Sequence, residues 1–167
     1  LGLALVLLNG FFVAAEFAIV KLRRTQAEEL AREHGLRGRV LNTVRGHLDA
    51  YLSACQLGIT LASLGLGWVG EPAFARLLEP LLAAVGVTDP QVLHSIAFAV
   101  AFAFISFLHI VLGELAPKSV AIRRAEAVSL NTAVPLYVFH WLMYPFIHVL
   151  NGAANVIVRR LGVELAS

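Results

Sequence analysis

The stretch LHSIAFAVAFAFISFLHIVL, residues 93–112, decides the fold of this chain. Its side chains are almost all apolar, and a helix of about 20 such residues crosses the hydrocarbon core of a bilayer. The residues GELAPKS, 113–119, follow directly, so the carboxylate of Glu114 lies at the end of the apolar run. Because a charged side chain at membrane depth is costly, it marks a functional site by default.

Pro117 gives Glu114 a neighbouring oxygen ligand. Proline has no N–H, so the helical carbonyl four residues earlier, on Gly113, loses its hydrogen-bond partner. A free carbonyl and a carboxylate are both hard oxygen ligands of the kind that Mg²⁺ and Ca²⁺ prefer. The sequence therefore predicts a cation site at Gly113 and Glu114. An ion pair between Glu114 and Lys118, four residues apart on one helix face, is the simpler alternative.

The composition indicates a membrane protein. The chain has 167 residues, of which 59% are hydrophobic and 14% charged, whereas soluble domains are about 25% charged. We expect one transmembrane domain over residues 1–167, of the all-α class, with spans at about 1–21, 51–70 and 92–115. The chain begins inside an apolar run without a methionine, so we expect it to be a piece of a larger protein.

The basic residues set the predicted orientation and argue against a nucleic-acid patch, because they cluster beside the apolar runs. Residues 21–49 are rich in Lys and Arg, whereas residues 71–91 hold Arg76 as their one basic residue. The first stretch is therefore predicted to be cytoplasmic and the second to face outward, with the N-terminus outside and the C-terminus cytoplasmic. Within the basic stretch we expect a helical hairpin over about 24–48, broken near Gly35 and Gly38.

Within a predicted helix over about 131–158, residues 134–158 are apolar enough for a fourth span, but three features argue against one. The apolar character of the segment is diluted by polar residues, namely His140, His148, Asn151 and Asn155. Pro135 and Pro145 interrupt the segment, and Arg159 and Arg160 would end outside if it crossed. We favour a kinked juxtamembrane helix at the cytoplasmic interface.

Each predicted span carries a stripe of polar or small residues at helical spacing, so that its members share a face. The stripes are Asn9 and Glu16 in the first span; Ser53, Gln56, Thr60, Ser63 and Gly67 in the second; and Ser95, Ser106, His109 and Gly113 in the third. If the three faces meet, Asn9, Thr60 and Ser63 complete the site of Gly113 and Glu114. All five offer oxygen, which suits Mg²⁺, Ca²⁺ or Na⁺ better than Zn²⁺ or Cu⁺.

Simpler interpretations of these residues stay open. A hydroxyl in a membrane helix usually bonds to a backbone carbonyl, and Asn9 and Gln56 could serve as interhelical hydrogen-bond partners. We interpret Glu16 as a partner of Lys21 and His109 as a packing residue. A ridge of small residues, suited to internal packing or to a dimer contact, consists of Ala54, Gly58 and Ala62.

The depths of the predicted ligands do not match. Asn9 lies about 18 Å along its helix from Lys21, at ~1.5 Å per residue, whereas Glu114 lies near the cytoplasmic end of its predicted span. The two can meet if the third helix ends well inside the bilayer, and Pro117 leads us to expect that it does.

Three motifs resemble a known family: LNGFFVAAEFA at 8–18, YLSACQLGITLASLGLG at 51–67 and GELAPK at 113–118. Together they are similar to the transmembrane (DUF21) domain of the CorC/CNNM (cyclin M) family. The resemblance implies a homodimer in the cell membrane, with three membrane helices and a juxtamembrane helix per protomer. It also implies Mg²⁺ transport, as efflux coupled to Na⁺ entry, and regulation by cytosolic nucleotide-binding CBS domains, which this chain lacks.

The resemblance also implies ligands. The family's ion site uses a Gly-Glu pair on the third helix, which matches Gly113 and Glu114, and a Ser-x-x-x-Ser pattern on the first helix. That pattern falls here on Asn9 and Val13; Asn9 can still offer a carbonyl oxygen, whereas Val13 cannot.

The leading functional hypothesis is a Mg²⁺ carrier that exposes a midmembrane site alternately to the two sides of the membrane. The alternative is a dimeric anchor or Mg²⁺ sensor that transports nothing and holds cytosolic regulatory domains. We do not expect an enzyme, because the sequence has no His-Glu-x-x-His, Gly-x-Ser-x-Gly or P-loop motif.

Overall fold

The computed structural model describes residues 1–162, which form helices and no strand; the last five residues of the predicted domain lie outside this range. The chain divides into two compact units. The first unit contains residues 1–14 and 58–123, and the second contains residues 15–57 and the chain from 124 onward. Helices α1 and α4 contribute residues to both units, and each unit is described by itself.

Three helices of the described chain are long and apolar enough to cross a membrane. The first is α1 (Gly2–Lys21). The second is a helix of 37 residues made of α4 (Leu48–Gly65), the π-helix η1 (Leu66–Gly70) and α5 (Glu71–Ala84). The third has 34 residues, in α6 (Pro90–Leu108), the π-helix η2 (His109–Leu115) and α7 (Ala116–Arg123). The prediction of an all-α protein with three candidate spans is confirmed.

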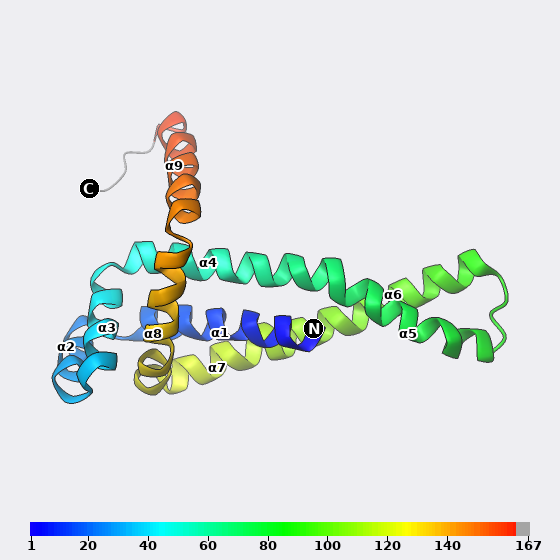
Figure 1. The fold of residues 1–167 in the computed structure, drawn as a ribbon, viewed down its shortest axis with the longest axis horizontal. Helices are drawn as coiled ribbons and strands as arrows, with labels where there is room; N and C mark the ends of the chain where they lie inside the picture. The colour runs from blue at the N-terminus through cyan, green and yellow to red at the C-terminus, as the bar shows by residue number, and fades with distance from the viewer. Residues whose placement is uncertain (163–167) are drawn as a thin grey trace. The chain divides into compact units, whose positions relative to one another are not determined.

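The second and third helices are longer than the sequence predicts, because residues 71–91 are not a loop. They form α5, a short turn and the start of α6, and the two helices pack as a hairpin (Figure 1). The rings of Phe74 and Phe104 stack across it at 4.8 Å. Pro72 lies two residues after η1, whose wider turn accommodates a residue that cannot donate, and Asp89 caps α6 by accepting the N–H groups of Gln91 and Val92.

Pro117 does not end the third helix, contrary to the prediction. It lies two residues after η2, in which hydrogen bonds join residues five apart; the N–H of Ala116, for example, donates to the carbonyl of Val111. The wider turn accommodates a residue that cannot donate, so the helix continues into α7.

This continuation removes the depth mismatch. Gly113 lies about 15 Å from Arg123 along the helix, and Asn9 lies about 18 Å from Lys21 along α1. Both residues therefore lie well inside their helices, and the third helix reaches Asn9 by extending further rather than by ending early.

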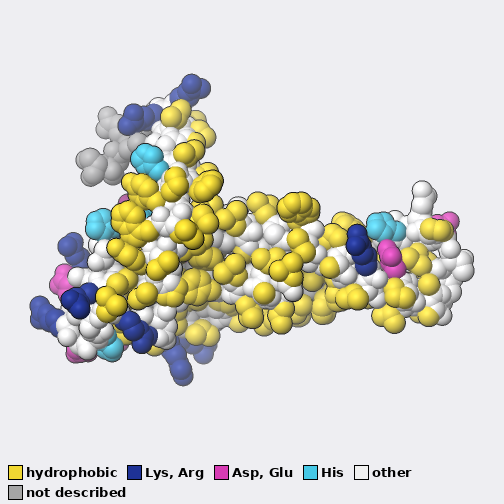
Figure 2. All heavy atoms as spheres, in the orientation of Figure 1, with side chains coloured by type: hydrophobic (Ala, Val, Ile, Leu, Met, Phe, Trp, Pro, Cys, Tyr) yellow, Lys and Arg dark blue, Asp and Glu magenta, His cyan; other side chains and the backbone are white. Residues whose placement is uncertain are grey.

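In the second unit, the basic stretch forms α2 (Arg24–Glu33) and α3 (Gly35–Gly46) (Figure 1). The chain turns at Gly35, whose φ of +55° is in the left-handed region. Gly38 is buried, and a Cβ there would lie 2.0 Å from the carbonyl oxygen of Leu30, so only glycine allows α3 to approach α2 this closely. Figure 2 shows Lys and Arg side chains gathered around these two helices.

The remaining helices are α8 (Ala125–Leu142), which packs against α3, and α9 (Tyr144–Arg160). They meet at a bend of 77° within the segment for which a kinked helix is predicted. Pro145 lies in the first turn of α9, where it is tolerated. By length and composition alone, the bent pair could also form one broken fourth span.

Candidate cation site

Four of the five predicted ligands meet in the first unit, at the contact of α1, α4 and η2. The side-chain amide of Asn9 donates from Nδ2 to the carbonyl oxygen of Gly113 at 2.9 Å. The hydroxyl of Ser63 donates to Oδ1 of Asn9 at 3.1 Å. Glu114 follows Gly113 in η2. The Gly113 carbonyl, which the sequence predicts to be free, is therefore satisfied by an amide from another helix.

His109, which the sequence favours as a packing residue, is a fifth member of this group. Its Nε2 lies 3.3 Å from the Ser63 hydroxyl and 4.0 Å from Oε1 of Glu114. In an α-helix, residues five apart point about 140° away from each other. The π-helix brings residues five apart to neighbouring positions, and Pro117 was the signal in the sequence that could have suggested it. We call Asn9, Ser63, His109, Gly113 and Glu114 the polar cluster.

The direction of each hydrogen bond in the polar cluster follows from the Gly113 carbonyl, which can only accept. The nitrogen of the Asn9 amide must face it, so the amide oxygen faces Ser63 and receives the hydroxyl proton. Ser63 then has no further proton to give, and His109 Nε2 must be the donor toward its oxygen. The Gly113 and Asn9 oxygens each keep a second lone pair that a cation could use.

Burial differs strongly across the polar cluster. Asn9 is fully buried, whereas the side chains of His109 and Glu114 are 20% and 45% exposed. An amide buried at the middle of a membrane helix needs partners for each polar atom, and Asn9 has them. Glu114 therefore lies at the exposed edge of the polar cluster.

Two glycines allow α1 to approach η2 so closely. A Cβ at Gly113 would lie 3.0 Å from Cδ2 of His109 and 3.2 Å from Nδ2 of Asn9. A Cβ at Gly10 would lie 3.0 Å from the ring of Pro117 and 3.1 Å from the carbonyl oxygen of Leu112. The polar cluster thus depends on both positions lacking a side chain.

Thr60, the fifth predicted ligand, is exposed and does not join the hydrogen bonds of the polar cluster in residues 1–162. Ser95 bonds to the carbonyl of Gln91 in the preceding turn, as the simpler interpretation holds. In the second unit, Gln56 donates to Glu16 at 2.9 Å, so Glu16 has an amide as its partner across helices.

Gly58 and Val13 lie near the polar cluster in the sequence, and both have packing roles. A Cβ at Gly58 would lie 2.5 Å from the ring of Phe12, so this member of the small-residue ridge serves internal packing. Val13, at the position of the family's second serine, is buried.

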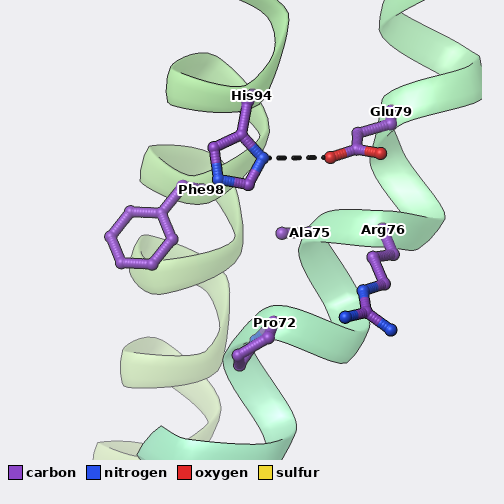
Figure 3. Close-up of a pocket in the computed structure, with 6 residues that line it drawn as sticks. All are labelled: Pro72, Ala75, Arg76, Glu79, His94 and Phe98. Carbon is purple, nitrogen blue, oxygen red and sulfur yellow. Dashed lines mark hydrogen bonds and ion pairs between the residues drawn. The ribbon is translucent and has the colours of Figure 1, made fainter. Parts of the chain in front are cut away.

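A groove of about 350 Å³ between α5 and α6 is a weaker candidate (Figure 3). His94 Nδ1 lies 3.1 Å from Oε1 of Glu79, and the guanidinium of Arg76 lines the same groove. The positive charge of Arg76 disfavours a cation, and the Glu79 carboxylate already has a partner. Over residues 1–162, neither the groove nor the polar cluster contains three or more grouped His, Cys, Asp or Glu side chains. The polar cluster differs from the groove in the neutral oxygens that it adds to its one carboxylate.

Comparison with known proteins gives consistent matches over the whole chain. A family model described as the cyclin M transmembrane N-terminal domain matches residues 1–167. The UPF0053 protein YhdT of Bacillus subtilis strain 168 is 51% identical over 163 residues, which cover 98% of this chain and 35% of YhdT. The UPF0053 protein YugS of the same strain is 49% identical over 95% of this chain and 37% of YugS.

A more distant relative is the UPF0053 protein sll0260 of Synechocystis, which is 29% identical over 95% of this chain and 35% of its own length. The chain thus spans about a third of the length of these curated relatives.

Proposed function

The chain belongs to the family of cyclin M transmembrane N-terminal domains, and we propose that it is the membrane domain of a divalent cation transporter with Mg²⁺ as its substrate. The observation that supports this proposal is the polar cluster, in which Asn9 and Ser63 converge on the Gly113 carbonyl next to Glu114. Polar groups of this kind inside apolar helices are costly and mark ion pathways.

The ligands of the polar cluster match the chemistry of Mg²⁺. This ion is usually bound by one or two carboxylates and keeps several waters. Glu114 supplies the charge, and the Gly113 carbonyl, Asn9 Oδ1 and Ser63 Oγ supply neutral oxygens. A site with one carboxylate binds weakly, which a carrier requires because the ion must also leave. Thr60 is omitted from this set because its side chain is exposed and lies outside the polar cluster.

The wider assignment rests on the family. We infer a homodimer in the cell membrane, with the N-terminus outside and the C-terminus cytoplasmic, that exports Mg²⁺ by alternating access in exchange for Na⁺. Cytosolic regulatory domains would lie in the part of the relatives that this chain does not span. The protein is proposed to act as a carrier and not as an enzyme.

Replacement of Glu114 by Gln tests the proposal, because it keeps the shape of the side chain and removes its charge. Mg²⁺ efflux from liposomes that contain the purified chain should fall to the level of empty liposomes. Glu79→Gln, in the groove of Figure 3, is the matched control and should leave the flux unchanged. An unchanged flux in Glu114→Gln contradicts the assignment of the site.

A non-transporting anchor or Mg²⁺ sensor is the second candidate. Large side chains on the exposed faces of the second helix, such as Leu64 and Trp68, suit contact with a second copy of the chain as well as with lipid. This candidate predicts a dimer that moves no Mg²⁺ under any tested gradient, so the same flux assay separates the two.

A further inference from the structure

We propose that His109 is a specificity-determining nitrogen ligand for first-row transition dications such as Ni²⁺ and Zn²⁺, so that the site that holds Mg²⁺ through its oxygens can hold these ions through His109 as well. The inference rests on the proposed function, since it concerns the same polar cluster. It adds a nitrogen donor to a site that the sequence predicts to contain oxygen alone.

The distances within the polar cluster fit a single ion. With metal–ligand bonds of about 2.1 Å, neighbouring ligands of an octahedral ion lie about 3.0 Å apart and opposite ligands about 4.2 Å apart. His109 Nε2 lies 3.3 Å from Ser63 Oγ and 4.0 Å from Glu114 Oε1. Ser63 Oγ in turn lies 3.1 Å from Asn9 Oδ1. All three separations fall within this range, so each of these neighbouring pairs of donor atoms can bind one ion together.

The local backbone holds the imidazole in this position. His109 is the first residue of η2 and Glu114 the sixth, so the π-helical spacing places the two side chains together. The ring also occupies the space that a side chain at position 113 would take, because a Cβ there would lie 3.0 Å from Cδ2 of His109. Gly113 therefore contributes both a carbonyl oxygen and room for the ring.

The chemistry of the donor set determines the class of ion. Imidazole nitrogen suits Zn²⁺, Ni²⁺ and related ions, whereas Mg²⁺ prefers oxygen. The polar cluster has no thiolate, so Cu⁺ is not favoured. Coordination uses the lone pair of Nε2; the proton that this nitrogen donates toward Ser63 is then carried by Nδ1 of the same ring. A carboxylate, an imidazole and two or three neutral oxygens form a mixed site that serves both kinds of ion.

Binding of Ni²⁺ and Mg²⁺ to the purified chain, measured by calorimetry, tests the inference. His109→Gln should weaken Ni²⁺ binding at least ~10-fold, since even the partners that orient a metal ligand contribute ~10–100-fold. Mg²⁺ binding should change by less than about twofold, because Mg²⁺ uses the oxygen ligands. His94→Gln, in the groove between α5 and α6, is the matched control and should affect neither ion.

Two results overturn the inference: Ni²⁺ binding that is unchanged in His109→Gln, or Ni²⁺ and Mg²⁺ binding that weaken equally, as expected of a packing residue. Because the His109→Gln variant could fail to fold, X-ray absorption of Ni²⁺ bound to the unmodified chain provides a second test. It should show scattering from an imidazole ring, and its absence equally overturns the inference.

The proposed function fails separately. If the chain binds Ni²⁺ through His109 but moves no Mg²⁺, the inference stands and the Mg²⁺ carrier does not. If Glu114→Gln abolishes Mg²⁺ flux but His109→Gln leaves Ni²⁺ binding intact, the carrier stands and the inference does not. If the chain binds neither ion, both are wrong.

Discussion

The π-helical segments η1 and η2 occupy two different long helices, and each ends two residues before a proline, Pro72 or Pro117. Each also lies at a Gly-Glu pair: Gly70 is the last residue of η1 and Glu71 follows it, whereas Gly113 and Glu114 both lie within η2. The surroundings differ. The second pair meets an amide, a hydroxyl and an imidazole, whereas a carboxylate oxygen of Glu71 is buried without a hydrogen-bond partner in the described chain.

The difference shows that the widened turn is not a site by itself. A proline in a long helix requires an adjustment of the hydrogen bonds, and a π-helical turn supplies it in both places. The turn at η2 becomes a candidate site because Asn9, from α1, reaches the Gly113 carbonyl. The chemistry therefore depends on what the neighbouring helices present.

The largest effect is expected from breaking the contact that distinguishes η2. Asn9→Leu removes the amide donor of the Gly113 carbonyl and the acceptor of the Ser63 hydroxyl, which keeps only His109 as a partner, and an unsatisfied buried group costs about 1–3 kcal/mol. The free energy of unfolding in detergent should fall by roughly 2–4 kcal/mol, and Mg²⁺ flux should be lost. Asn155→Leu, which removes an exposed amide from α9, is the control and should change neither. A fully stable Asn9→Leu protein contradicts this account of the polar cluster.

The next largest effect on stability is expected where α1 packs against η1 and η2. Gly10→Ala places a methyl group 3.1 Å from the backbone oxygen of Leu112, and Gly2→Ala places one 3.7 Å from the Cα of Gly70. The first is overpacked and should lose about 1–3 kcal/mol. The second makes an ordinary contact at the first residue of α1 and should change stability by well under ~1 kcal/mol, because the full propensity difference applies to the middle of a helix. Chemical denaturation of the pair measures the contrast, and equal effects would show that α1 packs on both turns alike.

The smallest effect is expected at Glu71, which is 9% exposed. Glu71→Gln removes the charge of a side chain whose Oε1 is buried without a hydrogen-bond partner in the described chain, and a neutral amide is less costly to bury than a carboxylate. Stability should rise by about 1 kcal/mol, and Mg²⁺ flux should stay the same because Glu71 does not belong to the polar cluster. Thermal melting and liposome flux are the measurements. A loss of flux as complete as that of Glu114→Gln would mean that both Gly-Glu pairs handle ions.

The sequence predicted the parts of the fold that depend on composition and turn chemistry. Apolar runs located the three spans, and Gly35 marked the turn between α2 and α3. The second and third helices extend beyond the predicted spans, because residues 71–91 were expected to connect the spans and Pro117 was expected to end the third helix. A periodicity of 3.6 residues contains no π-helix, so the extension of these helices could not be derived from it.

The same limit explains the candidate site. Asn9, Ser63 and Gly113 share the polar stripes, so helical spacing was enough to bring them together. His109 and Glu114 are five residues apart, and α-helical spacing separates them. Thr60 belongs to the same stripe as Ser63 but is exposed; spacing defines a face of a helix and does not define how much of that face is covered.

The continuity of the third helix through η2 has a mechanical consequence. Because the π-helical turn contains one residue more than an α-helical turn, it can shift along the helix by exchanging one hydrogen bond for the next. Each such step turns the residue it passes by about 100° and advances it by about 1.5 Å. Residues of η2 can thus rotate while the helix stays continuous. A single step would turn Glu114 away from His109, toward another side of the helix.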